Sequence, residues 1–208
     1  MRVYKFRTCQ YGLRAIRERR VRISEIRSLN DPFELLPFDL SDPDTRRGLI
    51  ASREEFGKSR GLLCFSMHWH NPVLWAHYAD GNRGICLGFD IPDDFQQPVT
   101  YVEQPIRLTH LDCEIANKTL FTKYEHWHYE EEIRTWASLE EKSGEDYFYN
   151  FGETLRLAEI IIGPGCMVSK RRVLQALGAN QKVVRLLKAR LAYTAFRVVE
   201  DENGFDGG

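Results

Sequence analysis

A strand–helix–strand unit between residues 62 and 91 is the part of the sequence that most constrains the fold. Leu62–Ser66 is a short apolar run that predicts a buried strand. Asn71 and Pro72 predict the start of a helix, because Asn caps helix N-termini and Pro fits the first helical position. Gly84–Ile91 is apolar apart from Asp90, which is typical of a strand covered on both faces. The chain must therefore build a sheet with a central strand and at least one helix packed beside it.

Further elements surround this unit. Alternating patterns predict strands at Val3–Thr8, Arg20–Ile26, Leu157–Gly163 and Leu191–Val199. Helical spacing predicts helices at Tyr11–Arg19, Thr45–Lys58, Glu114–Tyr124 and Ser169–Leu177, the last with Ser169 as its cap. Leu29–Glu34 has the Asn, Asp and Pro of a turn, Pro98–Glu103 and Arg107–Asp112 are further strand candidates, and residues 180–189 fit neither pattern. This order predicts an α+β fold in which strands dominate the second half.

Composition indicates a globular protein. At 208 residues, with 43% hydrophobic and 28% charged residues, the chain predicts a single domain over residues 1–200 and a short flexible tail over 201–208. No apolar run approaches the roughly 18 residues of a membrane span, so no membrane contact is expected. The five cysteines are scattered without a paired spacing, which favours free thiols in the cytoplasm.

The segment Trp127–Arg134 carries the most distinctive chemistry. As a strand it would place Glu130, Glu132 and Arg134 on one face, because alternate residues of a strand share a face. Paired carboxylates of this kind stabilise an oxocarbenium-like centre and activate a nucleophile in glycosyl transfer. We expect repulsion to raise the pKa of at least one of the two carboxyl groups, and Arg134 to hold the other ionised. The alternative is a solvent-facing edge strand with a local ion pair.

Other candidate residues lie earlier in the chain. Ser66 ends a strand beside a capped helix, where a hydroxyl can meet a ligand, and Trp75 and Tyr78 on that helix are either ligand contacts or core aromatics. Residues 2–27 carry nine Lys and Arg against two Glu. Such a basic segment either binds a phosphate-bearing ligand or nucleic acid, or forms a solvated helix face.

Two His-Trp-His triplets, at residues 68–70 and 126–128, could each place two imidazoles on one side of a strand. Spacing fixes no third ligand for either pair, so the sequence assigns no metal site. The Gly163-Pro164-Gly165 turn lacks the pattern of a phosphate-binding loop.

Seven motifs in order resemble one bacterial family, the domain of unknown function 2971. They are Tyr4–Arg7, Leu29–Glu34, Phe65-Ser66, Asn71–Tyr78, Arg83–Asp90, Trp127–Arg134 and Glu159–Gly163. The resemblance spans about Val3 to Val199, and the string of motifs is specific although each one alone is not. The name of that family assigns no activity.

The layout is also similar to the ADP-ribosyltransferase fold. The shared features are an opening strand with a basic residue, a hydroxyl-ended strand followed by an aromatic helix, and a late strand with Glu-any-Glu. This resemblance implies that Arg7, or Lys5 in its place, holds the nicotinamide ribose and that Ser66 lines the nicotinamide pocket. It implies that Tyr78, and Trp75 beside it, face the same pocket. Ser66 departs from the pattern, because Met67 follows it where those enzymes have a second hydroxyl.

For the carboxylates the same resemblance implies two roles. Glu132 would be the catalytic group at the oxocarbenium, and Glu130 would activate the acceptor. The fold implied is a single domain of split, curved, mainly antiparallel sheets with flanking helices, in which Arg7, Ser66, Tyr78 and Glu132 converge on a cleft.

The function implied is NAD-dependent ADP-ribosyl transfer, with NAD as a substrate, to a nucleic-acid or protein acceptor. Transferases of this fold often serve as toxins or anti-phage effectors, which implies a cognate antitoxin as a partner. Two alternatives stay open. One is a non-enzymatic defence module that binds nucleic acid or a nucleotide through the basic segment, and the other is an N-glycoside-cleaving enzyme with water as its only acceptor.

Overall fold

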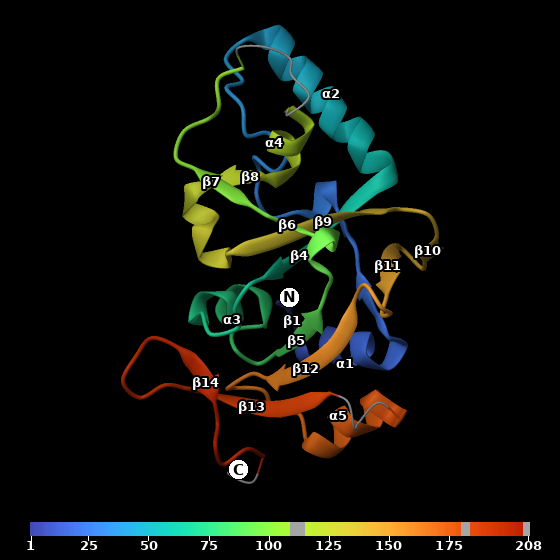
Figure 1. The fold of residues 1–208 in the computed structure, drawn as a ribbon, viewed down its shortest axis with the longest axis vertical. Coiled ribbons are helices and arrows are strands. Elements are labelled where there is room, and N and C mark those ends of the chain that lie inside the picture. Colours follow the sequence, from blue (N-terminus) through green and yellow to red (C-terminus); the bar gives the residue numbers. More distant parts are fainter. Residues whose placement is uncertain (109–114, 180–183, 206–208) are drawn as a thin grey trace. The chain divides into compact units, whose positions relative to one another are not determined.

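The computed structural model describes residues 1–108, 115–179 and 184–205 (Figure 1). The fold is α+β, as predicted, and the chain divides into two compact units. Unit 1 comprises Met1–Val21, Phe65–Phe95 and Asn150–Gly208, and unit 2 comprises Arg22–Cys64 and Gln96–Tyr149. Each unit is therefore assembled from segments far apart in the sequence. Among the described residues, no helix has both the length and the apolar character needed to cross a bilayer.

Unit 1 is built on one sheet with the strand order β14-β13-β12-β5-β1. Its strands are β1 (Arg2–Arg7), β5 (Ile85–Asp90), β12 (Arg156–Ile162), β13 (Arg185–Leu191) and β14 (Val198–Glu200). The β12–β13 pair is parallel and the other pairs are antiparallel. The side chains of β5 from Ile85 to Phe89 are fully buried, which confirms the prediction of a central strand at Gly84–Ile91.

Three α-helices belong to unit 1: α1 (Cys9–Glu18), α3 (Pro72–Tyr78) and α5 (Lys170–Leu177), with the short η2 (Asp93–Phe95). The predicted caps are confirmed. Asn71 Oδ1 accepts a hydrogen bond from the Val73 amide at 2.9 Å, and Ser169 Oγ accepts one from the Arg172 amide at 3.4 Å. Helices α1 and α5 pack against each other (Figure 1).

Aromatic side chains form much of the core of unit 1. The Trp75 ring is fully buried and meets Phe6 edge-on at 5.1 Å, while its indole N–H donates to the Trp69 carbonyl at 2.6 Å. A buried indole needs such an acceptor, so this contact fixes the ring. Trp75 is therefore a core aromatic in this structure, as one of the two interpretations of the sequence allowed.

Unit 2 combines short strands with helices. The chain passes between the units in β2 (Arg20–Arg22), β4 (Arg60–Ser66) and β11 (Asp146–Asn150). Within unit 2 lie β3 (Ser24–Glu25), β6 (Gln97–Pro98), β7 (Thr100–Val102), β8 (Thr122–Tyr124), β9 (Glu132–Ser138) and β10 (Lys142–Ser143), with α2 (Pro43–Ser59), α4 (Ile115–Phe121), η1 (Ile26–Ser28) and η3 (Glu125–Glu130). Strand β9 pairs antiparallel with β6, and β7 pairs parallel with β8.

Several predicted boundaries are wrong. The single strand expected at Arg20–Ile26 is instead two short strands, β2 and β3, followed by the 3-10 helix η1. Between β2 and β3, the Ile23 amide donates to the Tyr147 carbonyl. The expected helix Glu114–Tyr124 ends at Phe121, because Thr122 to Tyr124 pair with β7 instead.

The end of the chain also differs from the prediction. The expected last strand, Leu191–Val199, is interrupted: Leu191 ends β13, residues 192–197 form a loop, and Val198 and Val199 belong to β14. Strand β13 begins at Arg185, inside the stretch that fitted neither pattern. Of the candidate strand Arg107–Asp112, the first two residues are not in a strand, and residues 109–112 lie outside the described part of the chain, as do Cys113 and Glu114.

Candidate functional site

The segment Trp127–Arg134 is not one strand. Residues up to Glu130 form the 3-10 helix η3, Glu131 adopts a left-handed conformation with φ of 42°, and β9 begins at Glu132. The strand prediction is therefore right only for the last three residues of the segment. A left-handed Glu is uncommon, since Gly or Asn usually occupies such positions, so no sequence signal marked this break.

A lysine brings the two carboxylates together. Lys123 Nζ, which comes from β8, lies 2.6 Å from Glu130 Oε2 and 3.3 Å from Glu132 Oε2. All three side chains are buried. The expected proximity of the two carboxylates is thus present, but its cause is a shared cation rather than a shared strand face.

Arg134 completes the arrangement. Its Nε and Nη2 atoms donate to the two carboxylate oxygens of Glu132 at 2.9 and 3.0 Å, which is a bidentate ion pair. Its Nη1 atom donates to Glu34 Oε1 at 2.6 Å and to the Leu120 carbonyl at 2.8 Å. We call the five side chains of Glu34, Lys123, Glu130, Glu132 and Arg134 the buried charge cluster, which lies entirely in unit 2.

The charge cluster controls the ionisation of its members. Burial opposes the ionised form of Glu132, but Arg134 and then Lys123 outweigh it and lower the pKa of Glu132 to about 2. Burial raises the pKa of Glu34. The attraction of Arg134 lowers this pKa, but by less than burial raises it. Glu34, which the sequence had placed only in a turn, therefore has a raised pKa within the cluster. Repulsion from Glu130 does not raise the pKa of Glu132.

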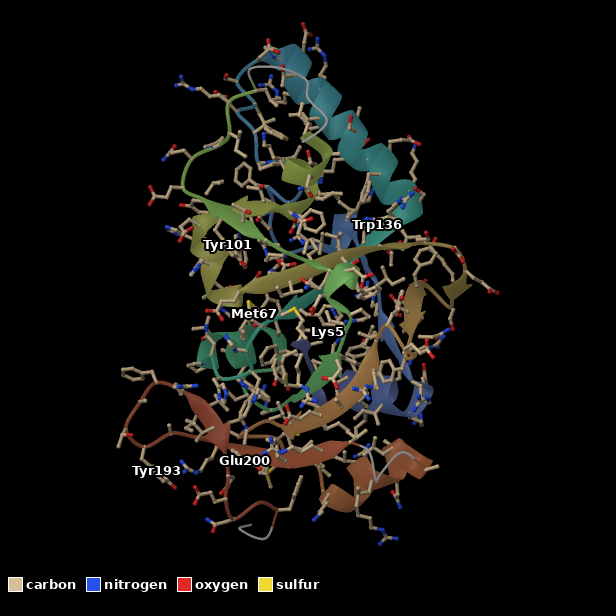
Figure 2. The ribbon with its side chains drawn as sticks, viewed as in Figure 1. Lys5, Met67, Tyr101, Trp136, Tyr193 and Glu200 are labelled. Carbon is tan, nitrogen blue, oxygen red and sulfur yellow. The ribbon has the colours of Figure 1, made fainter. Side chains whose placement is uncertain are left out.

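Backbone contacts hold the start of β9 in place. The Glu132 amide donates to the Tyr101 hydroxyl oxygen at 2.9 Å, and the Glu132 carbonyl accepts from the Val99 amide at 2.9 Å. Burial raises the pKa of Tyr101, so this hydroxyl stays protonated. The Tyr101 ring meets His128 of η3 edge-on at 5.1 Å, and Tyr101 is labelled beside η3 in Figure 2. The catalytic candidate Glu132 is thus rigidly placed.

A pocket of about 290 Å³ adjoins the charge cluster on β8. Thr122, Lys123 and Tyr124 line it together with residues 102–105, Phe33 and residues 36–40. Phe33 and Tyr124 expose 61% and 43% of their surface, so two aromatic side chains are available to a ligand there. Mainly apolar pockets with a few polar groups are the usual form of small-molecule sites.

The candidate residues of unit 1 gather around the ends of β1 and β4. Tyr4 of β1 lies opposite Ser66 of β4, and the Lys5 ammonium lies 5.1 Å from the centre of the Phe65 ring. Ser66 is buried, and its hydroxyl donates to the His68 carbonyl at 3.0 Å. Lys5 is buried as well, whereas Arg7, two residues further along β1, is half-buried.

Tyr78 is half-buried at the end of α3, with its ring edge-on to His77 at 6.1 Å. The candidates Arg7, Lys5, Ser66 and Tyr78 belong to unit 1, and the carboxylates Glu130 and Glu132 belong to unit 2. The expected convergence of the two sets on one cleft stays a prediction.

The His-Trp-His triplets do not form strands. Residues 126–128 lie in η3, where the His126 ring stacks on Tyr124 at 4.6 Å. His70 directs its Nδ1 atom to the Val198 carbonyl at 2.8 Å. Over residues 1–108, 115–179 and 184–205, no three or more His, Cys, Asp or Glu side chains are grouped in a way that could hold a metal ion.

Comparison of the chain with protein-family models, with curated proteins and with solved structures finds no match. The two family resemblances therefore rest on the sequence motifs themselves.

We expect Arg134→Met to lower the free energy of unfolding by about 3–5 kcal/mol, because it leaves Glu132 and Glu34 buried without their shared partner. Urea denaturation followed by circular dichroism measures this loss. Arg22→Met is the matched control, since Arg22 pairs with Asp146 at 2.7 Å in the same unit but is 43% exposed. The control should lose about 1 kcal/mol or less. Equal losses in both variants would contradict the structural role of the cluster.

The charge cluster also predicts how stability depends on pH. A pKa lowered from 4.5 to about 2 contributes stability above the unfolded-state pKa, and this contribution disappears as the pH falls from about 4.5 towards 2. Between pH 5 and pH 3 the loss should be on the order of 2 kcal/mol, measured as the free energy of unfolding in urea. Glu132→Gln should flatten this fall.

Glu34 supplies the opposite control. Its raised pKa means that protonation in the folded state stabilises the protein as the pH falls towards the unfolded-state value of about 4.5. Glu34→Gln should remove that gain and make the loss on acidification steeper than in the wild type. If Glu34→Gln and Glu132→Gln change the pH dependence in the same direction, the assignment of the two pKa shifts is wrong.

Proposed function

We propose that this protein is an ADP-ribosyltransferase-like enzyme that cleaves NAD and transfers the ADP-ribosyl group to an acceptor. The observation that supports this proposal most is the state of Glu132, a buried carboxylate held ionised by Lys123 and Arg134 at the start of a strand. Loss of nicotinamide from NAD leaves positive charge on the ribose, and a fixed negative charge stabilises that charge without solvent reorganisation.

The low pKa of Glu132 defines its role in this reaction. A carboxylate with a pKa of about 2 is a poor proton acceptor at neutral pH, so Glu132 acts through its charge and not as a general base. Activation of the acceptor then falls to Glu130, whose Oε2 atom shares the Lys123 ammonium with Glu132. Glu132 would stabilise the positive charge on the ribose, and Glu130 would deprotonate the acceptor.

The pocket on β8 supports ligand binding in the same unit. Lys123 lines the pocket and also holds both carboxylates, so a ligand in the pocket would lie beside the charge cluster. The exposed rings of Phe33 and Tyr124 offer stacking faces to the planar rings of NAD.

The resemblance to the ADP-ribosyltransferase fold assigns roles to residues of unit 1 as well. Arg7, or Lys5 in its place, would bind the nicotinamide ribose of NAD, Ser66 would line the nicotinamide pocket, and Tyr78 would stack on its ring. The basic residues of unit 1 favour a nucleic-acid acceptor, and a role as a toxin or anti-phage effector would require a cognate antitoxin. The resemblance to the ADP-ribosyltransferase fold supports this assignment.

We expect Glu132→Gln to slow nicotinamide release from NAD by on the order of 10²–10³-fold, because it removes the charge that stabilises the oxocarbenium. Glu130→Gln should leave nicotinamide release largely intact and abolish label transfer to the acceptor. Incubation with labelled NAD and a cell lysate, followed by separate measurement of nicotinamide and of labelled macromolecules, distinguishes the two effects. Glu131→Gln is the matched control, because Glu131 lies between the two carboxylates in sequence and is exposed.

Loss of activity must be separated from loss of fold. Glu132 is buried and binds Arg134 and Lys123, so Glu132→Gln should lower the stability of the fold as well as the activity. Circular dichroism and NAD binding by calorimetry should therefore be measured on each variant, with Glu132→Asp as the second variant that keeps the charge. Wild-type protein that neither binds NAD at millimolar concentration nor releases nicotinamide would overturn the proposal.

A second candidate function has its own observation. Unit 1 contains 17 Lys and Arg against 11 Asp and Glu, whereas unit 2 contains 12 against 19. In unit 1, exposed Lys170, Arg171 and Arg172 begin α5, which packs against the Arg-rich helix α1. A non-enzymatic module that binds nucleic acid would use this basic surface.

The second function makes a different prediction. Nucleic-acid binding should weaken steeply with salt, because phosphate contacts release counterions, and a double change of Arg171 and Arg172 to Glu should abolish it. Fluorescence anisotropy with a labelled oligonucleotide at rising salt measures this. Binding that survives Glu132→Gln, in a protein that releases no nicotinamide, would favour the module. Binding unaffected by the change on α5 would exclude this surface.

A further inference from the structure

Cys9 and Cys166 are far apart in the sequence but lie at the same end of the unit 1 sheet. Strands β1 and β12 are both antiparallel to β5, so they run parallel to each other and terminate at the same end of the sheet. The register shows this directly, because Arg7 and Ile162 both lie opposite Ile85. Cys9 follows Arg7 by two residues, and Cys166 follows Ile162 by four.

The two thiols are neighbours. A hydrogen bond with Cys166 and the charge of Cys166 both act on the ionisation of the Cys9 thiol, and both are free cysteines. Cys9 is half-buried and Cys166 is buried, so Cys9 is the more accessible of the two. A disulfide needs two cysteines on backbone segments that can approach each other, and the strand register places the two segments at the same end of the sheet.

Rigid elements hold both cysteines. Cys9 is the first residue of α1, whose first turn is fixed by the hydrogen bond from the Gly12 amide to the Thr8 carbonyl at 2.9 Å. The Cys166 amide donates to the Gly163 carbonyl at 3.0 Å, and the Cys166 carbonyl accepts from Lys188 Nζ at 2.7 Å. Lys188 also donates to the Gly163 carbonyl at 2.9 Å and so fastens the whole turn to β13.

We propose that Cys9 and Cys166 form a reversible intramolecular disulfide, a redox modification site that is separate from the proposed transferase chemistry. The oxidant would be a peroxide or a small-molecule disulfide. With hydrogen peroxide, the two thiols lose two electrons and two protons, one S–S bond forms, the O–O bond breaks, and two water molecules leave. With a small-molecule disulfide, two exchange steps give the protein disulfide and two reduced small thiols.

Exposure sets the order of the steps. Peroxide reaches the half-buried Cys9 first and oxidises it to the sulfenic acid, releasing one water molecule. The enclosed Cys166 thiol then attacks the Cys9 sulfur, and the second water molecule leaves. Burial, followed by the neighbouring Cys166, raises the pKa of Cys9 to about 11, so little thiolate exists at neutral pH and oxidation should be slow.

The modification has a structural consequence. A bond between Cys9 and Cys166 would tie the start of α1 to the turn after β12 and would close most of the chain into one loop. Closing a long loop restricts the unfolded chain and so stabilises the folded state. Oxidised protein should therefore resist urea better than reduced protein.

The test uses the full chain. Reduced protein is incubated for hours with hydrogen peroxide, and separately in glutathione buffers of rising oxidised fraction, then denatured, alkylated, digested and analysed by mass spectrometry. We expect the number of alkylated cysteines to fall from five to three and a cross-linked peptide to join Cys9 to Cys166. The urea midpoint should rise on oxidation and return to the reduced value after dithiothreitol.

Variants identify the pair. Cys9→Ser and Cys166→Ser should each abolish the cross-linked peptide and the shift of the urea midpoint, whereas Cys86→Ala should keep both, because Cys86 lies inside β5. Five alkylated cysteines after complete incubation would overturn the proposal, as would a cross-link that joins other cysteines or two copies of the chain. The wild-type measurement decides the question even if a variant fails to fold.

Discussion

The bidentate ion pair between Arg134 and Glu132 is the interaction on which the arrangement of unit 2 depends. Arg134 is fully buried, and its guanidinium also binds Glu34 and the carbonyl of Leu120. These contacts join β9 to the turn around residue 34 and to the end of α4. Burying an arginine costs several kcal/mol unless its donors are satisfied, so these segments must come together for unit 2 to fold. The short strands of unit 2 contribute little area alone, and the charge cluster supplies a specific geometry that apolar packing would not define.

The same contacts separate the chemical properties of two neighbouring carboxylates, Glu132 and Glu34. Glu132 receives two nitrogens of Arg134 as well as Lys123, and its pKa falls to about 2. Glu34 receives one nitrogen of the same guanidinium and has a raised pKa. Burial and the unequal share of the two cations, with repulsion from Glu132 adding to the effect at Glu34, decide which of the two groups stays charged. A permanently charged group beside a protonatable one is an arrangement that acid–base enzymes use repeatedly.

Local signals predicted the parts of the fold that depend on local physics. The caps Asn71 and Ser169 and the apolar strand β5 follow from side-chain bonds and burial within a few residues. The partners of Arg134 could not be predicted in this way, because Glu34 lies 100 residues earlier in the sequence. Lys123 was predicted to lie in a helix, but that helix ends at Phe121 and Lys123 belongs to β8. Residues 127–130 were predicted to lie in a strand, but they belong to a 3-10 helix that ends at the left-handed Glu131. The proximity of Cys9 and Cys166 depends on the order of strands in the sheet, which their sequence spacing does not reveal.

Stability alone gives no reason for a cluster of five ionisable side chains in the core of unit 2. Replacing buried ion pairs by apolar residues of similar volume often leaves a protein equally stable or more stable, whereas removing one partner is costly. Several residues of the cluster must therefore be substituted together before an apolar core can replace it. The cluster contributes structural specificity rather than extra stability. The one property that apolar residues cannot replace is a fixed negative charge on β9. The proposed reaction requires this same property of Glu132. The carboxylate that is costly to bury is therefore also the group to which the proposed function assigns the catalytic role.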